Sequence, residues 1–197
     1  MKQLIFLILI FMIPHGFATS PGTSNVSARI TDFGEEFGYG IMFSPTQMFL
    51  VNVNGHFSHS TSSIEYPSTQ QDGPDTTHYA IHVFPELRFY NRPKSKISPF
   101  FGVFTHFGYG GGVRELPDNQ DAGLAQSQLT IGAGFSTGAE VFLSRYLSLA
   151  VSARWLHYTF ENASQIHDTG SMEITTKHIS HNLDLKFNPA VYLRLHF

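Results

Sequence analysis

The stretch "RWLHYTFENA", residues 154 to 163, holds residue types that could carry out hydrolysis. His157 and Thr159 lie two positions apart, so on a β-strand both side chains point to the same face. A hydroxyl nucleophile with an imidazole base beside it is the core of an acyl-transfer site, and an acidic group is needed to orient the base. The same two residues also suit a strand that leaves an apolar layer for water. We prefer this second interpretation and keep hydrolysis as an alternative.

A second set of chemically capable residues is a series of charges that alternate with apolar neighbours. Both signs occur, and charges removed from water persist when they are paired. Glu140 and Arg154 flank one short turn, so we expect them to form the first ion pair. We interpret the whole set as a charge network that fills an interior. Its members share the face that otherwise carries Gly, Ser and Thr: Glu86, Arg88, Glu140, Arg154, Asp184, Lys186 and Arg194.

Composition argues against several other kinds of site. Cysteine is absent, so disulfides, thiolate metal ligands and a Cys nucleophile are excluded. The most suggestive pair among the 11 histidines, His178 and His181, has a spacing that puts the two rings on opposite faces of a strand. We therefore expect no metal and no cofactor. The formal net charge is −3 and no run of Lys and Arg forms a basic stripe, so we expect no nucleic-acid partner.

The elements that would position these residues are β-strands. Apolar side chains recur at every second position, and no helical period is found after the first residues. Aromatic residues make up 14% of the chain, and charged residues make up 14% against about 25% in a typical protein. Together with a weaker pattern at 25–33, the clear alternations predict eight strands, the others being 36–43, 48–57, 78–90, 98–110, 129–141, 146–160 and 179–197.

The connections between these strands alternate in length. Residues 58–77, 110–125 and 161–177 are long and polar, whereas "SPTQ", "NRPKSKI" and "LSRY" are short. We therefore expect all the long loops at one end of the molecule. The last strand keeps its parity through Pro189, which has no N–H to donate, so we expect one continuous strand with a local break in the ladder there.

The first 18 residues have the composition of a cleavable signal peptide. Lys2 precedes an apolar run from Leu4 to Ile13, and Gly16 and Ala18 supply the small residues of a cleavage site. A run of 10 apolar residues is too short for a spanning helix, which needs about 20 residues. We expect cleavage after Ala18 and a single domain over residues 19–197.

The alternating pattern fits either a soluble barrel with an apolar interior or a membrane barrel with an apolar exterior. The signal peptide, the uneven connections and the small residues of the polar face favour the membrane. Gly132, Gly134, Ser136 and Gly138 suit the interior of an eight-stranded barrel, where little side-chain volume fits. The predicted fold is all-β: an eight-stranded antiparallel transmembrane β-barrel, integral to a bacterial outer membrane.

The chain resembles the small OmpA- and OmpX-type bacterial outer-membrane β-barrels. The resemblance lies in "IGAGFSTGAEVFLSRYLSLAVSARWLHYTF", which is similar to the penultimate hairpin of that family, in "ISPFFGVFTHFGYG", similar to the strand before it, and in the ending "VYLRLHF". It implies that the barrel-assembly machinery recognises the end of the chain. The residues of that expected signal are Val191, Leu193, Leu195 and Phe197.

The stretch around His157 also resembles the His-x-Ser-Asn motif of outer-membrane lipid A 3-O-deacylases. This resemblance implies that His157 is the base, Thr159 the nucleophile and Glu173 the orienting acid, acting on lipid from the membrane side. Thr replaces the Ser of that family and Phe160 replaces its Asn, so we expect a structural or surface-interaction role without catalysis. The deacylase and a narrow porin-like channel remain the alternatives. The expected partners are outer-membrane lipid, the assembly machinery and an extracellular ligand of the long loops.

Overall fold

The computed structural model describes nine stretches of the chain, and every regular element in them is a β-strand. No helix within these stretches is long and apolar enough to cross a membrane. The expected signal peptide, residues 1–18, and Lys186 of the expected charge network lie outside them. The described residues are 21–30, 36–60, 63–66, 69–72, 75–91, 96–115, 123–168, 173–185 and 187–197.

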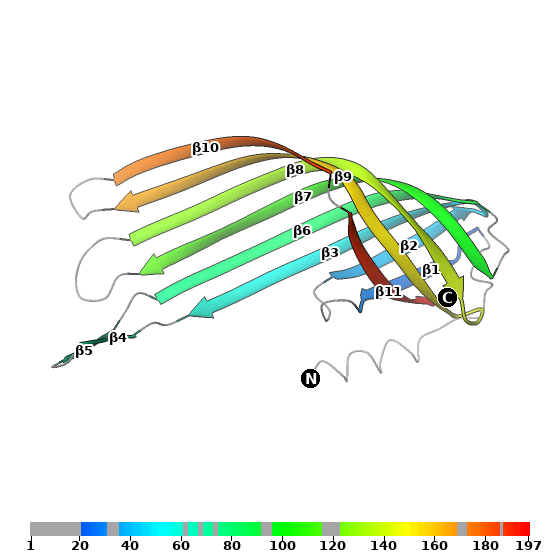
Figure 1. Ribbon diagram of the computed structural model, residues 1–197, viewed down its shortest axis with the longest axis horizontal. Coiled ribbons are helices and arrows are strands. Elements are labelled where there is room, and N and C mark those ends of the chain that lie inside the picture. The colour runs from blue at the N-terminus through cyan, green and yellow to red at the C-terminus, as the bar shows by residue number, and fades with distance from the viewer. Residues whose placement is uncertain are drawn as a thin grey trace.

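The strands follow the period-two pattern of the sequence, and the weak pattern at 25–33 also contains one. A two-stranded hairpin, β4 with β5, extends from the connection between β3 and β6 (Figure 1). The bounds are β1 (Ser24–Arg29), β2 (Glu36–Ser44), β3 (Gln47–Ser60), β4 (Ser63–Tyr66), β5 (Thr69–Asp72), β6 (Asp75–Tyr90), β7 (Ile97–Glu115), β8 (Gly123–Phe142), β9 (Leu147–Asp168), β10 (Glu173–Asp184) and β11 (Asn188–His196).

The remaining nine strands form one antiparallel sheet that closes into a ring. Its order is β10-β9-β11-β1-β2-β3-β6-β7-β8, and β8 pairs again with β9. Because β10 and β11 follow one another along the same side of β9, the nine strands occupy eight positions around the ring. The prediction of an all-β antiparallel sheet is therefore confirmed.

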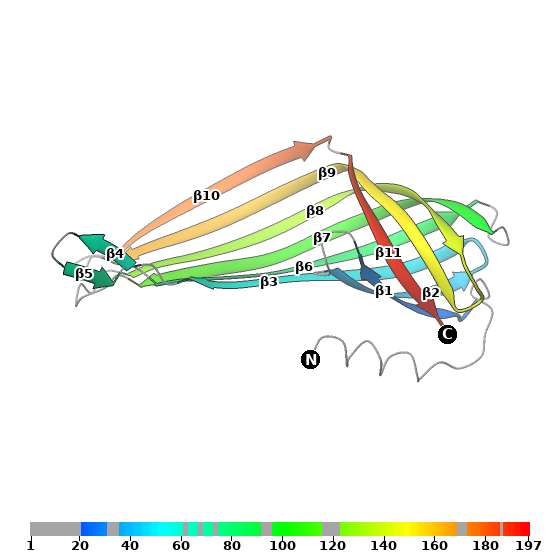
Figure 2. The same ribbon diagram turned by 60° about the horizontal axis from the view of Figure 1, so that its bottom comes forward.

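The ring has a closed half and an open half. In the closed half, next to the short turns, β1 joins β11 to β2 and completes the circle. In the open half, β3 beyond Asn54 pairs only with β6, and β10 pairs only with β9 among the described residues. Figure 2 shows β10 running along an outer edge with no strand on its other side. The open half is thus a curved sheet with two free edges.

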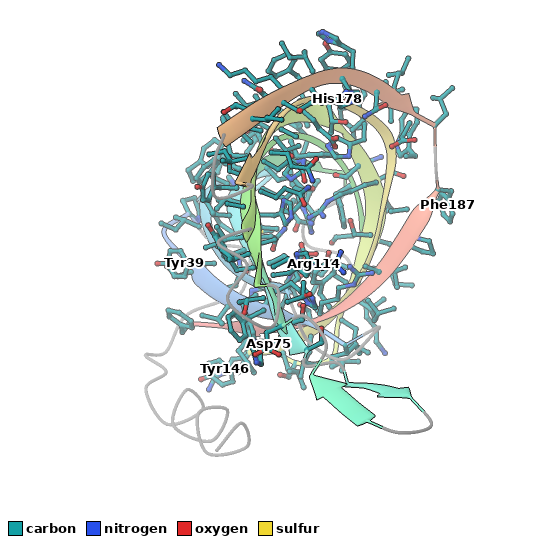
Figure 3. The ribbon with its side chains drawn as sticks, turned by 90° about the vertical axis from the view of Figure 1, so that its left-hand side faces the viewer. Tyr39, Asp75, Arg114, Tyr146, His178 and Phe187 are labelled. Carbon is teal, nitrogen blue, oxygen red and sulfur yellow. The ribbon has the colours of Figure 1, made fainter. Side chains whose placement is uncertain are left out.

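The two faces of the sheet are opposite in character, as the alternation of β7 illustrates. Val103 and Phe107 are 40% and 49% exposed on the outside, whereas Phe104 and His106 are 1% and 6% exposed inside. Successive side chains on a strand point to opposite faces, so the sequence period becomes an inside and an outside. Figure 3 looks into the ring from the end with the long connections, with Tyr39 and Phe187 on its outside and Arg114 within it.

Much of the sequence expected as long loop is strand. The described turns at 45–46 and 143–146 lie at one end of the molecule, and the C-terminal ends of β7 and β9 lie at the other, as the alternating connection lengths predict (Figure 1). β7 runs to Glu115 and β9 to Asp168, well into the segments 110–125 and 161–177. In these segments polar residues occur on both faces of the strand, so the alternation of apolar and polar residues becomes too weak to predict a strand. The backbones of neighbouring strands nevertheless continue to pair.

The expected single strand over 179–197 is wrong, because the structure divides it into β10 and β11. The last β10 pair is Asp184 with His157, and β11 resumes at Asn188 opposite Arg154. The break therefore comes just before Pro189, close to the predicted local break. Pro189 itself is paired in register with Ala153 on β9.

A β-bulge in β9 lies at the same level as this break. The register between β8 and β9 shifts between Phe135 and Ser136, which pair with Leu156 and Arg154 and leave Trp155 as the extra residue. A bulge inserts one residue and changes the face to which the following residues point. On β9, every face assigned from parity beyond Trp155 is reversed as a result.

Candidate functional site

The closed half holds a set of ion pairs inside the ring, and the first is centred on Glu140 of β8. Arg194 Nη1 on β11 donates to Glu140 at 2.8 Å, and Tyr90 on β6 donates its hydroxyl at 2.7 Å. Ser148 also donates to this carboxylate, and His196 Nε2 lies 3.2 Å from it. These groups come from four strands, so the cluster ties the circumference together.

The second ion pair lies within β6. Arg88 forms a two-point contact with Glu86, with donor–acceptor distances of 2.7 and 3.0 Å, and Ser136 donates to Glu86 at 2.5 Å. The Arg88 guanidinium also lies 4.3 Å from the centre of the Phe100 ring. Residues two apart on a strand share a face, so this pair follows directly from the sequence spacing.

The third cluster is centred on Glu36 of β2. Arg154 Nη2 donates to its carboxylate at 2.7 Å, Tyr192 donates at 3.1 Å, and Arg29 lies at 3.7 Å. The predicted pair of Glu140 with Arg154 is therefore wrong. In the ladder Arg154 lies opposite Ser136 and Glu140 lies opposite Ala150, so the two are displaced along the strands. Glu36 shares the parity of Gly38 and Gly40, and this signal could have identified it.

Apolar side chains fill the space between the ion pairs. Met48, Leu50, Tyr192, Phe100 and Phe104 are all buried inside the closed half. With the charged clusters they pack the interior, as expected for a ring of only eight positions.

Three histidines form a hydrogen-bonded row at the boundary between the two halves. The Nδ1 atom of His82 lies 2.9 Å from Nε2 of His106, and Nδ1 of His106 lies 3.2 Å from Nε2 of His157. Phe84 stacks on His106 with ring centres 4.4 Å apart and an interplanar angle of 11°. A Cβ atom on Gly108 would overlap the His82 ring, so glycine at this position makes room for the row.

The sequence did not reveal this row. His82 and His106 fall on the predicted inner face of neighbouring strands, but the bulge at Trp155 hid the third member. His157 and Thr159 were expected to face lipid, and instead His157 contacts His106 while Thr159 is only 7% exposed. Tyr158, between them, is 43% exposed. The expected lipid-facing position of His157 and Thr159 is wrong.

Glu173, the third residue of the alternative deacylase interpretation, is far along the sheet from the other two. Glu173 pairs with Asp168 at one end of β10, whereas Asp184 at the other end pairs with His157. The two ends of a twelve-residue strand are about 36 Å apart at ~3.3 Å per residue. The backbone therefore places Glu173 too far from His157 to orient it, and these three residues form no triad.

Beyond the histidine row, the open half contains a hollow of about 190 Å³. Its lining includes His56, His78, Tyr79, Gln126 and Gln128, together with small residues. His178 and His181 lie on exposed β10, where Nδ1 of His181 lies 2.7 Å from the Tyr158 hydroxyl. Within the described residues no three His, Asp or Glu side chains are arranged to hold a metal ion.

The expected assembly signal lies on β11, between β9 and β1. Its apolar residues alternate with the buried Tyr192, Arg194 and His196. The backbone of the terminal Phe197 exchanges two hydrogen bonds of 2.9 Å with Ser24. Val191, Leu193, Leu195 and Phe197 therefore share the outward-facing side of the chain end where the ring closes.

The fold and interior define an all-β protein whose antiparallel sheet closes into a ring around paired charges. No family model and no curated protein matches the chain. Among solved structures, the crystal structure of Acinetobacter baumannii CarO2 is similar over 90% of this chain and 98% of that one, with 8% identity and a TM-score of 0.37. A similarity of this degree assigns neither a family nor an activity.

Proposed function

We propose that the chain is an integral outer-membrane β-barrel with a structural or surface-interaction role. The observation that carries the proposal is the inversion of the usual burial pattern. Arg88 and Arg194 are 1% and 0% exposed, whereas Phe101 and Phe107 are 39% and 49% exposed. In a protein surrounded by water, charged residues are almost never fully buried unless they are paired, and large exposed apolar surfaces are rare. A lipid solvent makes this exterior favourable.

The packed closed half supports a role without transport. The three ion-pair clusters and the aromatic side chains between them occupy the interior of the closed half, next to the short turns. An eight-stranded barrel is close to filled by its own side chains. Recognition then belongs to the polar open half, and the proposal includes no catalysis because His157, Thr159 and Glu173 do not form a triad.

The proposal includes the route to the membrane. Residues 1–18 act as the signal peptide, and the alternating end of β11 at Val191, Leu193, Leu195 and Phe197 is the feature that the barrel-assembly machinery binds. Both elements suit export of a chain whose exterior is unstable in water.

The single tryptophan provides the test. Trp155 lies on the outer face and is 38% exposed, so bromine-labelled acyl chains should quench its fluorescence after reconstitution into vesicles. Trp155→Phe combined with Phe101→Trp should also be quenched, because Phe101 points outward in the same apolar region.

A matched control separates lipid contact from general accessibility. Trp155→Phe combined with Phe57→Trp moves the fluorophore to a 72% exposed position in the open half, where soluble acrylamide should quench it and brominated lipid should not. Equal acrylamide quenching of all three proteins, with no effect of brominated lipid, would refute the membrane proposal. A protein that is quenched by brominated lipid should also stay folded in SDS when the sample is not boiled.

A further inference from the structure

The row of His82, His106 and His157 joins three strands at the level where β10 separates from β11. The rings come from β6, β7 and β9, and their four participating nitrogen atoms form two hydrogen bonds of 2.9 and 3.2 Å. The outermost ring, His157, is also the β9 residue that faces the last residue of β10, Asp184. The row thus ends at the point where the open half begins.

The chemistry of imidazole limits how many protons such a row can hold. A neutral imidazole has one donor and one acceptor nitrogen, so each of the two hydrogen bonds has a direction. If His157 donates to His106 and His106 donates to His82, an additional proton fits on the free Nδ1 of His157 without breaking either bond. A second proton on Nδ1 of His82 would turn two donors toward each other and break the first hydrogen bond.

The surroundings favour His157 as the ring that takes this proton. Directly opposed residues in an antiparallel ladder have Cβ atoms about 5 Å apart, so the Asp184 carboxylate is the neighbouring anion of His157. Arg154 of β9 opposes a positive charge on the row, but its guanidinium is bound by Glu36 at 2.7 Å and lies over Phe84.

Among the described residues, the other packed elements bring no competing anion to His157. On β8, Gly134 lies opposite His157, and Gly132 lies opposite the neighbouring Thr159. β7 contributes His106, and β6 contributes His82, whereas Glu86 is already bound to Arg88. Asp184 is therefore the acidic group at this end of the row.

We propose that His82, His106 and His157 form a one-proton binding site, and that the protonated His157 holds Asp184 and with it the free strand β10 against β9. As the pH falls below about 6.5, the value at which a free imidazole gains its charge, the open half then changes from a loosely held to a firmly held edge. The proton is the ligand of the site, and β10 is the element that responds.

Nuclear magnetic resonance of the ¹⁵N-histidine-labelled protein in micelles tests the occupancy. At pH 5, His157 should show two protonated ring nitrogens, while His82 and His106 should each show one. Charge appearing first on His82, or on all three rings together, would overturn the one-proton assignment. Asp184→Asn should reduce the charged fraction of His157 at a given pH.

Distance measurements test the response of β10. The chain has no cysteine, so Phe57→Cys on β3 and Ile179→Cys on β10 give two unique sites for spin labels, both on exposed positions. In the otherwise unchanged chain, the distribution of label distances should narrow as pH falls from 8 to 5. This narrowing should be lost in Asp184→Asn and in His157→Gln.

Two controls make the outcome decisive. His178→Gln removes an exposed histidine from β10 and should leave the narrowing of the distance distribution unchanged. Each variant is verified as folded by its resistance to SDS in a sample that is not boiled. Narrowing that persists in Asp184→Asn would refute the coupling to β10. Narrowing produced at pH 8 by Zn²⁺, and abolished by a chelator, would replace the proton by a metal as the ligand.

Discussion

The closed and open halves use the same long strands to build different interiors. In the closed half, carboxylates meet guanidinium groups at 2.7 to 2.8 Å and the residues between them are packed. In the open half, the inner face carries histidines, glutamines and glycines around a hollow, and within the described stretches the sheet has two free edges. The difference follows from β1 and β2, which are too short to accompany the other strands beyond the level of Asn54.

This difference shows how one sheet can separate stability from responsiveness. A closed ladder leaves no backbone groups unpaired, and buried charges fixed from several strands resist displacement. A free edge retains unpaired N–H and C=O groups and opens at low cost, so the parts that move are drawn from such regions. The variants below compare the two halves, beginning with the largest expected effect.

Removal of the Arg194 charge should have the largest effect on the free energy of unfolding. Arg194→Met keeps much of the side-chain volume but leaves Glu140 buried without its principal cation, a change that costs about 3–5 kcal/mol. Urea unfolding in micelles, followed by Trp155 fluorescence, provides the measurement.

Two further variants show whether the lost ion pair is the cause. Arg194→Met combined with Glu140→Gln should recover a large part of the stability, because it removes the unpaired charge. Arg145→Met, at an exposed turn position, should change stability by less than about 0.5 kcal/mol. A double variant no more stable than Arg194→Met would show that packing dominates the closed half.

A glycine in each half tests the difference in packing. A Cβ on Gly138 would lie 2.6 Å from the Phe100 ring and overlap the Val151 carbonyl, so Gly138→Ala should destabilise the protein by about 1–3 kcal/mol. A Cβ on Gly55, on the open part of β3, would find its nearest atom 3.9 Å away, so Gly55→Ala should be neutral or slightly stabilising. Similar losses of unfolding free energy in Gly138→Ala and Gly55→Ala would contradict the difference in packing between the two halves.

The sequence predicted the strands better than the contacts between them. Period-two alternation identifies Val103 or Phe107 as outward because that signal is local to one strand. The partner of Glu140 depends on the displacement of neighbouring strands around the ring, which no single stretch encodes. The predicted partner, Arg154, is wrong for this reason. Arg88 with Glu86, by contrast, needs only the spacing of one strand.

The error at His157 has a different physical cause. One extra residue at Trp155 reverses the face of the rest of β9, and a bulge has no obligatory residue type in the sequence. On β9, Arg154 before the bulge could be placed on the correct face from parity, whereas His157 after it could not. Parity arguments are therefore reliable only up to the first irregularity in a ladder.

Charge neutralisation at matched positions in the two halves should give the smallest effect. Glu36→Gln retains the shape and an acceptor for Arg154 and Tyr192 but removes the charge, and we expect a loss of about 1–2 kcal/mol. The loss should be smaller than for Arg194→Met because the side chains of Arg29 and Arg154 are 18% and 20% exposed, so water screens the charge left behind.

Glu161→Gln makes the same chemical change on β9 in the open half. Glu161 accepts a hydrogen bond of 3.4 Å from Ser180, a long contact at a partly exposed position, so its loss should stay below about 0.5 kcal/mol. Unfolding of the two variants under identical conditions compares the halves directly. A larger loss for Glu161→Gln than for Glu36→Gln would place the decisive electrostatics in the open half, and the closed half could then no longer be regarded as the stable base on which β10 moves.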